Sequence, residues 1–411
     1  MAVSPGQPDA LKSLRERSRS EGDLFWIDPE QLAVLDPAGA QILNNQNFSD
    51  LALPDKLTDL LLRREGTKVY WQRLRDLWLA RTRELMEQEH LAALAGRMEA
   101  LLAERTERRG DLIWVIQEVF SRALIPMVVG GLDASGMAQV QRDQDFKIRQ
   151  NVGIGFATGF GGRSRETWAQ LRTGWVVRRE LQGRAAGRRP RRLDYADPIV
   201  DLLPELGIGR AVDAVTGVLT AIGGPPGGAA SCLAYALVRH PQWQEQLEEE
   251  LSAIPLAELC AAPTRAAPKT SRVVRESLRL WTPTAILGRP VRKHLEYRGH
   301  QLRPGQDYFV SPDLLHHDAR YWKNPDTFDP DRWLEEAGRC PHVGGPIYVP
   351  FGWNPRSCIG AGVGMAQLIL FCHLVCVGYR IEVDKPEDLA MALPGMPIPQ
   401  NFTGRIVPRS I

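Results

Sequence analysis

The sequence lacks the local signatures of several common kinds of enzyme site. It contains no Walker A loop, no H-E-x-x-H and no pair of C-x-x-C motifs, which removes the usual indications of nucleoside triphosphate or zinc binding. Six cysteines in 411 residues are too few for a disulfide framework, so a reducing compartment is expected. A glycine-rich stretch holds Gly153, Gly155 and Gly159, but a polar segment precedes it instead of the strand that a dinucleotide fingerprint requires.

A net charge of one sign and long apolar runs are also missing. With 51 basic and 49 acidic residues the formal net charge is +2, which argues against a dedicated nucleic-acid-binding protein. We find no run of about eighteen apolar residues, and residues 1–23 lack the apolar core of a signal peptide. Together with 44% hydrophobic and 24% charged residues, this predicts a folded cytoplasmic protein without a membrane span.

Hydrophobic spacing predicts a mainly α-helical protein with small β-sheets towards the C-terminus. Residues 71–109 repeat apolar positions at helical spacing, and 212–235 is long and apolar but interrupted by Gly and Pro. Residues 295–312 alternate around turn residues and predict hairpin strands, whereas the Ala- and Pro-rich stretch 260–270 predicts a loop. We find no internal repeat and no clear boundary, so a single domain over 1–411 is expected, without a fused reductase.

Arginine is concentrated between Arg172 and Arg192, in a segment that ends in RAAGRRPRRLD. The favoured interpretation is a helix end and a charged loop in contact with solvent. The alternative is a docking surface for an acidic partner or substrate, including a substrate tethered to an acidic carrier protein.

Two pairs of residues with metal-ligand chemistry are assigned structural roles. His316 and His317 are adjacent and point in different directions, so a loop or strand-end role is favoured over a metal site. Cys372 and Cys376 are four residues apart on an apolar helix, where filling the core is favoured over binding a metal.

Cys358 stands between Arg356 and the glycine-rich start of an apolar helix, in the stretch GWNPRSCIGAG. The helix dipole and the arginine are expected to lower the pKa of this thiol. Phe351 and Trp353 can supply apolar cover. Four glycines leave room for a large planar group to approach the backbone: Gly352, Gly360, Gly362 and Gly364. A thiolate presented in this way suits iron held by one protein sulfur, and the alternative is a buried structural cysteine.

This stretch resembles the haem-ligand loop of the cytochrome P-450 family, which has the form F-G-x-G-x-R-x-C-x-G. The residues in register are Phe351, Gly352, Arg356, Cys358 and Gly360. Asn354 takes the place of the second glycine of that pattern, and since Asn tolerates a left-handed backbone better than most residues, the loop is expected to survive. The resemblance implies haem b (iron protoporphyrin IX) between a long central helix and the cysteine-ligand helix, with Cys358 as the catalytic iron ligand.

Other motifs of the family follow in the expected order. The resemblance implies that Glu276 and Arg279, an E-x-x-R pair, join Arg332 in a buried ion cluster that supports the ligand loop. It also implies a set of anchors for the anionic haem propionates: Trp71 and Arg75 in a W-x-x-x-R pair, Arg289, and Arg356. The ordered set identifies the chain as a member of the cytochrome P-450 family.

The segment AIGGPPGG, residues 221–228, occupies the position of the family's central helix, where an acid and a threonine usually deliver protons. In one alignment Gly227 and Gly228 replace that pair, and in another, about one turn away, Pro225 replaces the threonine. Two prolines and four glycines predict a kinked or unwound segment. Two interpretations are equally favoured: either the helix only kinks and ordered water replaces the lost side chains, or the protein catalyses a different reaction from that of the family.

The resemblance also implies a substrate pocket near the iron. Its expected residues are Gly224, Pro225, Pro226, Gly227, Gly228, Ala285, Ile286, Met396 and Ile398, within the wider stretches 221–228 and 283–287 and the GMPIP turn.

The expected activity is that of a haem-thiolate oxidoreductase of the monooxygenase type, acting on a lipophilic or mid-sized organic substrate of secondary metabolism. Electrons would come from a separate ferredoxin or flavoprotein that docks on the face carrying the Cys358 loop. Two alternatives stay open: a peroxide-dependent or redox-neutral enzyme (peroxygenase, dehydratase or isomerase), and a non-enzymatic haem protein that binds ligands.

Overall fold

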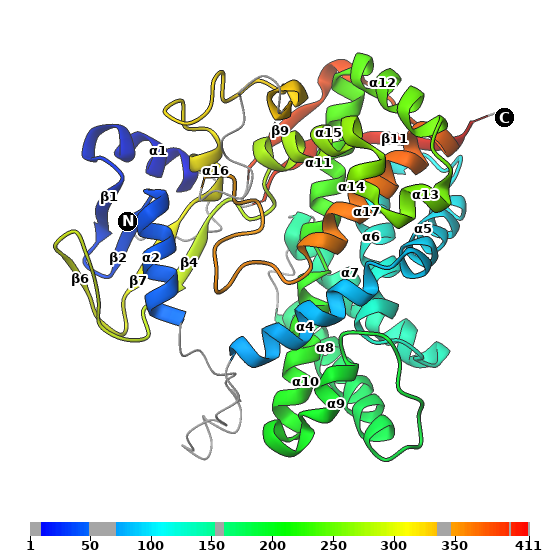
Figure 1. Cartoon of the computed structure of the whole chain (residues 1–411), viewed down its shortest axis with the longest axis horizontal. Coiled ribbons are helices and arrows are strands. Elements are labelled where there is room, and N and C mark those ends of the chain that lie inside the picture. The colour runs from blue at the N-terminus through cyan, green and yellow to red at the C-terminus, as the bar shows by residue number, and fades with distance from the viewer. Residues whose placement is uncertain (1–9, 49–70, 153–159, 335–346, 394–395, 410–411) are drawn as a thin grey trace.

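The structure, a computed structural model, describes residues 10–48, 71–152, 160–334, 347–393 and 396–409. A smaller part, built around a sheet and containing the described N-terminal residues, lies beside a larger helical part (Figure 1). The prediction of a mainly α fold with small sheets is confirmed. Gly153, Gly155 and Gly159, of the glycine-rich stretch, lie outside the described residues.

Helices make up most of the described chain. They are α1 (Ala10–Glu21), α2 (Pro37–Phe48), α4 (Trp71–Leu85), α5 (Gln88–Ala103), α6 (Leu112–Val128), α7 (Ala134–Val152), α8 (Phe160–Ala185), α9 (Asp197–Asp201), α10 (Leu203–Ala221), α11 (Pro225–Arg239), α12 (Pro241–Ser252), α13 (Leu256–Ala261), α14 (Pro263–Ala266), α15 (Pro268–Leu280), α16 (Pro312–His316) and α17 (Ala361–His373). Shorter turns are η1 (Pro330–Trp333), η3 (Leu374–Gly378, a π-helix) and η4 (Pro386–Asp388).

Within the described residues the strands are short and form four sheets. They are β1 (Leu24–Asp28), β2 (Gln31–Val34), β3 (Gly110–Asp111), β4 (Leu287–Pro290), β5 (Leu295–Tyr297), β6 (His300–Leu302), β7 (Asp307–Val310), β8 (Tyr379–Val383), β9 (Ala390–Ala392), β10 (Ile398–Gln400) and β11 (Thr403–Pro408). The largest sheet has the order β1-β2-β7-β4, in which β2 and β7 are parallel and the other pairs antiparallel.

The hairpin predicted between residues 295 and 312 is present. Arg298 and Gly299 both have positive φ, as a tight two-residue turn between β5 and β6 requires. The prediction of a loop over 260–270 is wrong, because α13 ends there, α14 follows and α15 begins. Pro263 and Pro268 each occupy the first turn of a helix, where proline costs no intrahelical hydrogen bond, so Pro-rich sequence here starts helices instead of preventing them.

The main hydrophobic core lies in the helical part. There α6 packs against α5 and α11, and α17 packs against α5, α11 and α15. A second cluster joins the largest sheet to α2 and to the chain just before the cysteine loop, with Val349 and Trp353 buried in it. The cysteine loop therefore runs between the two cores, and each core fixes one of its ends.

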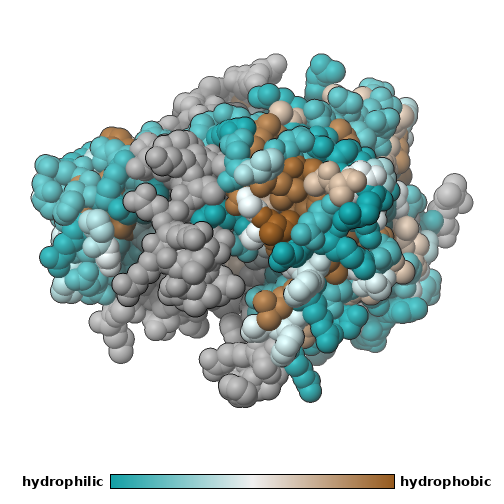
Figure 2. All heavy atoms as spheres, turned by 90° about the horizontal axis from the view of Figure 1, so that it is seen from below, coloured by the Kyte–Doolittle hydropathy of each residue, from teal (hydrophilic) through white to brown (hydrophobic). Residues whose placement is uncertain are grey.

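Two described helices pass a length-and-composition test for a membrane span. Leu203–Arg239, taken as one segment, has a mean hydropathy of 1.3 and Ala361–Gly378 has 1.9, with 44% and 61% of the tested windows buried in the protein. Buried core helices of soluble proteins have the same length and composition, and the absence of a membrane span stays a prediction. Seen from below, the helical part carries a hydrophobic patch on a largely hydrophilic surface (Figure 2).

Candidate functional site

Cys358 lies in the wall of a cavity just before α17. The backbone N–H of Cys358 donates to Phe351 O over 2.8 Å, which closes the loop, and Gly364 N–H donates to Gly360 O over 2.8 Å in the first turn of the helix. The exposed surface of the thiol faces this cavity. Gly352 has φ +75°, which glycine adopts without strain.

The expected lowering of the thiol pKa is wrong for the free side chain. Protein atoms surround the sulfur, and this desolvation raises the pKa of Cys358 above its usual value. The N–H of Gly360 and the charge of Arg75 act in the opposite direction and are outweighed. Both donors are nevertheless in place beside the sulfur, so they favour a thiolate once a metal ion supplies the main compensating charge.

The cavity has two lobes that meet at Cys358. One lobe has a volume of about 250 Å³ and extends towards β4, and the other has about 440 Å³ and extends towards α4 and α6. Both are lined by Ala221, Pro226, Arg356, Cys358, Gly360 and Gly364. Cavities of this size hold small organic ligands and cofactors.

The predicted break in the central segment is confirmed. Helix α10 ends at Ala221 and α11 begins at Pro225, with a turn between them. Pro225 and Pro226 occupy the first turn of α11, where their missing N–H groups leave no intrahelical bond unmade. These prolines start a second helix, so the break needs no strained backbone at either residue.

Of the expected substrate-pocket residues, only Pro225 and Pro226 line the cavity. The others are not among the residues that line its two lobes: Gly224, Gly227, Gly228, Ala285, Ile286, Met396 and Ile398. Gly227 faces α6 and Gly228 faces Met396, while the carbonyl of Ala285 accepts a 2.8 Å hydrogen bond from Ser311 Oγ. Within the wider stretches predicted from sequence, Ala221, Pro283, Thr284 and Leu287 do line it.

Gly227 and Gly228 are glycines because neighbouring residues occupy the space of a side chain. A Cβ at Gly227 would lie 2.7 Å from Gln117 Cα on α6, and one at Gly228 would lie 2.7 Å from Met396 Sδ. In the amide orientation that satisfies its partners, buried Gln117 donates to Gly224 O over 3.0 Å and accepts from Gly228 N over 3.1 Å. The first turn of α11 is thus held by a side chain of α6.

Sequence reasoning missed three polar residues of the cavity wall. They are Tyr195, which lies just before α9, Asp213 on α10 and Gln367 on α17. The Tyr195 hydroxyl lies 2.8 Å from Thr82 Oγ1, which is also 3.1 Å from the carbonyl of Ile359, next to the cysteine. Desolvation raises the pKa of Tyr195 to about 12, so its hydroxyl stays protonated. These residues come from separate elements and share no sequence motif, so no local signal could have found them.

Arg289 and Arg356 give one lobe of the cavity a positive charge without a counter-ion among the described residues. Arg289 Nε is buried without a hydrogen-bond partner, and desolvation followed by the charge of Arg356 lowers the pKa of Arg289 to about 10. Desolvation, followed by the charge of Arg292, also lowers the pKa of Arg356. Both guanidinium groups lie over the Phe48 ring, at 5.9 and 5.0 Å. An anionic ligand in this lobe would relieve both groups.

Trp71 and Arg75, the other two expected anchors, hold the cysteine loop itself. Trp71 Nε1 donates to Pro355 O over 2.9 Å, and Arg75 donates to Ser357 O over 2.8 Å and to Ser357 Oγ over 2.7 Å. Asn354 does not adopt the expected left-handed backbone. Its Oδ1 instead accepts from Ser357 Oγ over 2.8 Å and from Arg75 over 3.3 Å, so it contributes contacts that glycine could not make.

Glu276, Arg279 and Arg332 form one buried ion cluster. Glu276 accepts both Arg279 Nε and an Arg279 terminal nitrogen, at 3.0 and 2.8 Å, and Arg332 Nε at 3.0 Å. Trp333 Nε1 and the Asp329 N–H complete its set of donors, each over 3.0 Å. The two arginines turn their remaining N–H groups to backbone carbonyls before the cysteine loop, so the cluster is fully satisfied and fixes that segment.

His316 extends this cluster to the cysteine loop, a role that sequence reasoning missed. It is the last residue of α16, not part of a loop or strand end. Its Nε2 lies 2.9 Å from the Val349 N–H and its Nδ1 lies 3.1 Å from Arg279 O, so Nδ1 carries the proton and Nε2 accepts. Desolvation, followed by the charge of Arg279, moves the pKa of His316 well below its usual value, which keeps the ring neutral.

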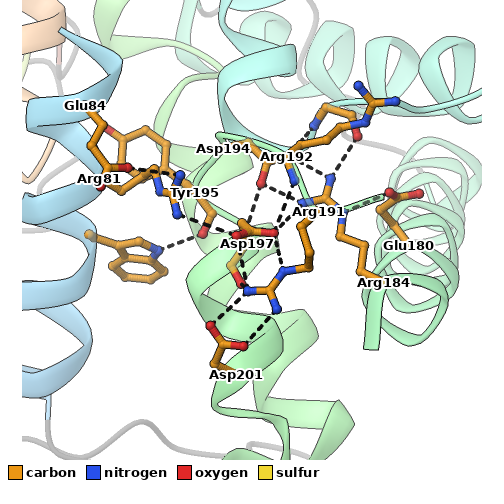
Figure 3. Close-up of polar contacts among 12 residues, drawn as sticks. Arg81, Glu84, Glu180, Arg184, Arg191, Arg192, Asp194, Tyr195, Asp197 and Asp201 are labelled. Carbon is orange, nitrogen blue, oxygen red and sulfur yellow. Dashed lines mark hydrogen bonds and ion pairs between the residues drawn. The ribbon is translucent and has the colours of Figure 1, made fainter. Parts of the chain in front are cut away.

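Arginines at the end of the arginine-rich segment bind carboxylates of this chain, among them Arg184 and Arg191 (Figure 3). The Arg184 side chain is fully buried, donates to both carboxylate oxygens of Asp194 over 2.8 and 2.7 Å, and contacts Glu180 over 3.0 Å. Arg191 binds Asp197 and Asp201 (Figure 3). The interpretation as a solvated loop is therefore wrong for Arg184, and the ion network positions the neighbouring Tyr195 at the cavity.

Comparison with known proteins agrees with this geometry. The family model for cytochrome P-450 matches residues 229–402. Thromboxane-A synthase of Rattus norvegicus is 33% identical over 169 residues, which is 40% of this chain and 31% of that protein. Cyclooctatin synthase of Streptomyces melanosporofaciens is 42% identical over 113 residues, or 28% of this chain and 24% of that protein. The chain thus spans a third or less of the length of these relatives.

A solved structure shares the whole fold. A zebrafish cytochrome P-450 determined with progesterone superposes with a TM-score of 0.76, covering 99% of this chain and 100% of that one at 17% sequence identity. At this identity the likeness concerns the fold. It extends beyond residues 229–402, which the family model matches, to nearly the whole chain.

Proposed function

The chain belongs to the cytochrome P-450 family, whose cofactor is haem b, and on that premise we propose that it is a haem-thiolate oxidoreductase of the monooxygenase type. The observation that carries the proposal is the position of Cys358. Its thiol opens into a cavity of the size of a ligand site, at the start of a helix, between the N–H of Gly360 and the charge of Arg75. No other described cysteine is exposed.

The described residues fit the cofactor. Cys358 would supply the axial sulfur, and Arg289 and Arg356, without counter-ions among the described residues, match two carboxylates of the porphyrin. Trp71 and Arg75 hold the loop from the side of α4, and Phe351, Gly352 and Gly360 shape its backbone. When bound, the haem supplies the oxygen-activation chemistry. The chain supplies the sulfur ligand, a largely apolar cavity and the groups that hold protons at its wall.

The substrate class follows from the walls beyond the cysteine. Apart from the arginines, the cavity is bounded largely by apolar side chains of α6, α10 and β4, among them Phe120, Leu124, Val218 and Leu287. The cavity wall also contains polar side chains that carry no positive charge. They are Tyr195, Asp213, Thr284, Ser357 and Gln367. We therefore propose a lipophilic or mid-sized organic substrate bearing one or two polar groups, in secondary metabolism.

We propose that a separate ferredoxin or flavoprotein supplies the electrons, on the face that carries the Cys358 loop, and that the protein acts in the cytoplasm as one domain. The fold match covers nearly the whole chain with one cytochrome P-450 fold.

A second candidate function is favoured by one observation. Gly227 faces Gln117 and Gly228 faces Met396, while Pro225 lines the cavity, so α11 offers neither an acid nor an alcohol there. A peroxide-dependent or redox-neutral reaction, as of a peroxygenase, dehydratase or isomerase, would need no such pair. Turnover with ferredoxin, its reductase and NADPH, compared with peroxide alone and with neither, separates the candidates.

Replacement of the proposed ligand tests the assignment. In Cys358→Ser the reduced, haem-loaded protein should lose the thiolate signature of its carbon monoxide difference spectrum, while Cys260→Ser, at a buried cysteine, should keep it. Persistence of the signature in Cys358→Ser would show that another group binds the iron. Ligand binding without turnover under all three conditions above would favour a haem protein that only binds ligands.

A further inference from the structure

One face of α8 exposes apolar side chains that the fold does not use. Trp168, Leu171 and Trp175 are 63%, 53% and 69% exposed, and they are three of the five exposed large hydrophobic residues in the described chain. Their spacing of three and four residues places them on one side of the helix. The opposite side, with Val177 and Leu181, is fully buried against the rest of the protein.

The same face of α8 also carries two arginines whose positive charges are not paired with a carboxylate of the described chain. Arg172 lies between the two tryptophans, and the Arg178 guanidinium lies 5.8 Å from the centre of the Trp175 ring. Neither forms an ion pair with a described residue. By contrast Arg179, next to Arg178, is paired with Asp133. We call Trp168, Leu171, Arg172, Trp175 and Arg178 the tryptophan–arginine face.

A shallow depression borders this face. It has a volume of about 420 Å³ and is lined by Trp175, Val176, Gln182, Ser135 and three arginines: Arg178, Arg179 and Arg188. Such a depression can receive side chains of another protein, with the arginines placed to bind carboxylates. Trp and Arg are also the residue types that most often dominate the binding energy of protein interfaces.

The positive charge of this face favours an acidic protein as its partner over a second copy of this chain or a lipid surface. Two copies of this face would bring Arg172 and Arg178 of each copy against the same residues of the other, which like-charge repulsion disfavours. A lipid surface needs a broad apolar helix side, whereas here arginines alternate with the tryptophans and only one aliphatic side chain is present. We propose that the tryptophan–arginine face docks an acidic protein partner, independently of the chemistry at Cys358.

The proposal redraws the docking surface expected from the sequence. Arg184 and Arg191 bind carboxylates of this chain, so they are not available to a partner (Figure 3). Arg172 and Arg178 lie on α8 and Arg188 lines the depression, and the two tryptophans of α8 supply apolar anchors that the sequence pattern alone did not single out.

The test uses the haem-loaded full chain and an acyl carrier protein as the acidic probe, because a ferredoxin is proposed above to dock on the face of the Cys358 loop. We expect the acyl carrier protein to bind saturably, with affinity that falls as salt rises. Arg172→Glu with Arg178→Glu should abolish that binding, and Trp168→Ala with Trp175→Ala should weaken it about 30-fold or more. The control pair, Arg108→Glu with Arg303→Glu, reverses exposed charges elsewhere and should leave it unchanged.

Several outcomes would overturn the proposal. They are failure of the acyl carrier protein to bind, or binding of that protein that the substitutions on α8 do not alter. Binding of the wild type to vesicles of anionic lipid, or self-association in sedimentation, would also overturn it if the Trp168→Ala/Trp175→Ala variant lost that property. Circular dichroism and haem content, unchanged in each variant, establish that the fold is intact.

Discussion

Alanine at Gly227 is expected to destabilise the protein much more than alanine at the adjacent Gly228. At Gly227 the new Cβ would lie 2.7 Å from the Cα of Gln117, so two buried helices, α6 and α11, must move apart. At Gly228 it would lie 2.7 Å from Met396 Sδ and 2.9 Å from its Cε, the flexible end of a side chain that can rotate away. The same chemical change therefore meets backbone at one position and a movable thioether at the other.

The magnitudes follow from packing and helix propensity. Overpacking a close-packed core costs about 1–3 kcal/mol, and replacing a helical glycine by alanine returns up to about 1 kcal/mol. We expect Gly227→Ala to lower the free energy of unfolding by about 2 kcal/mol, and Gly228→Ala by less than about 1 kcal/mol. Guanidinium unfolding of the haem-loaded proteins, followed by circular dichroism, measures both.

A double-mutant cycle supplies the control. Met396→Ala opens the space beside Gly228, so combining it with Gly228→Ala should show a favourable coupling of about 1 kcal/mol. The same cycle with Gly227→Ala should show no coupling, because Met396 does not limit that position. Equal stabilities of the two alanine variants, or coupling of Met396 to Gly227, would refute the steric explanation.

Two further predictions concern the supports of the cysteine loop. His316 is buried and neutral, and its pKa is depressed, so the unfolded chain binds a proton that the folded one does not as pH falls below about 6.5. The free energy of unfolding should then fall by up to about 1.4 kcal/mol per pH unit on acidification. The difference in this free energy between wild type and His316→Gln, measured from pH 7.5 to 5.5, should therefore shrink as the pH falls. A constant difference would contradict the assignment of a neutral ring. Glu276→Gln removes the carboxylate that pairs with two buried arginines and should lower the free energy of unfolding by about 3–5 kcal/mol. Glu89→Gln, at an exposed position, should change it by no more than about 0.5 kcal/mol. Similar effects of the two substitutions in guanidinium unfolding would show that the two arginines do not depend on the Glu276 charge.

Motifs that are local in the sequence were sufficient for much of the site. Cys358 and Arg356 share one loop, and Glu276 and Arg279 share one helix face, so spacing alone relates them. Hydrophobic periodicity gave the helical body, and paired turn residues at Arg298 and Gly299 gave the hairpin, because both signals act over a few residues.

What the sequence could not predict depends on contacts between distant segments. The pKa of Cys358 is raised because protein atoms enclose the sulfur and desolvate it. The position of a cysteine at the start of a helix indicates the effect of the helix dipole on the pKa, but it does not reveal this enclosure. The motif predicts Trp71 and Arg75 as propionate anchors, and it does not indicate that they also donate to the carbonyls of Pro355 and Ser357. The burial of Arg184 required knowledge that Asp194 folds back on it.

The missing acid and alcohol of the central helix also look different once packing is considered. If Gly227 and Gly228 had lost their side chains without consequence, empty space should remain beside them. Instead Gln117 and Met396 fill that space, and the Gln117 carboxamide bonds to the first turn of α11. Threonine at Gly228 would therefore meet Met396 and not the cavity, so it could not restore a hydroxyl near Cys358. Any proton donor at the cavity has to come from other elements, where Asp213 and Thr284 lie in its wall.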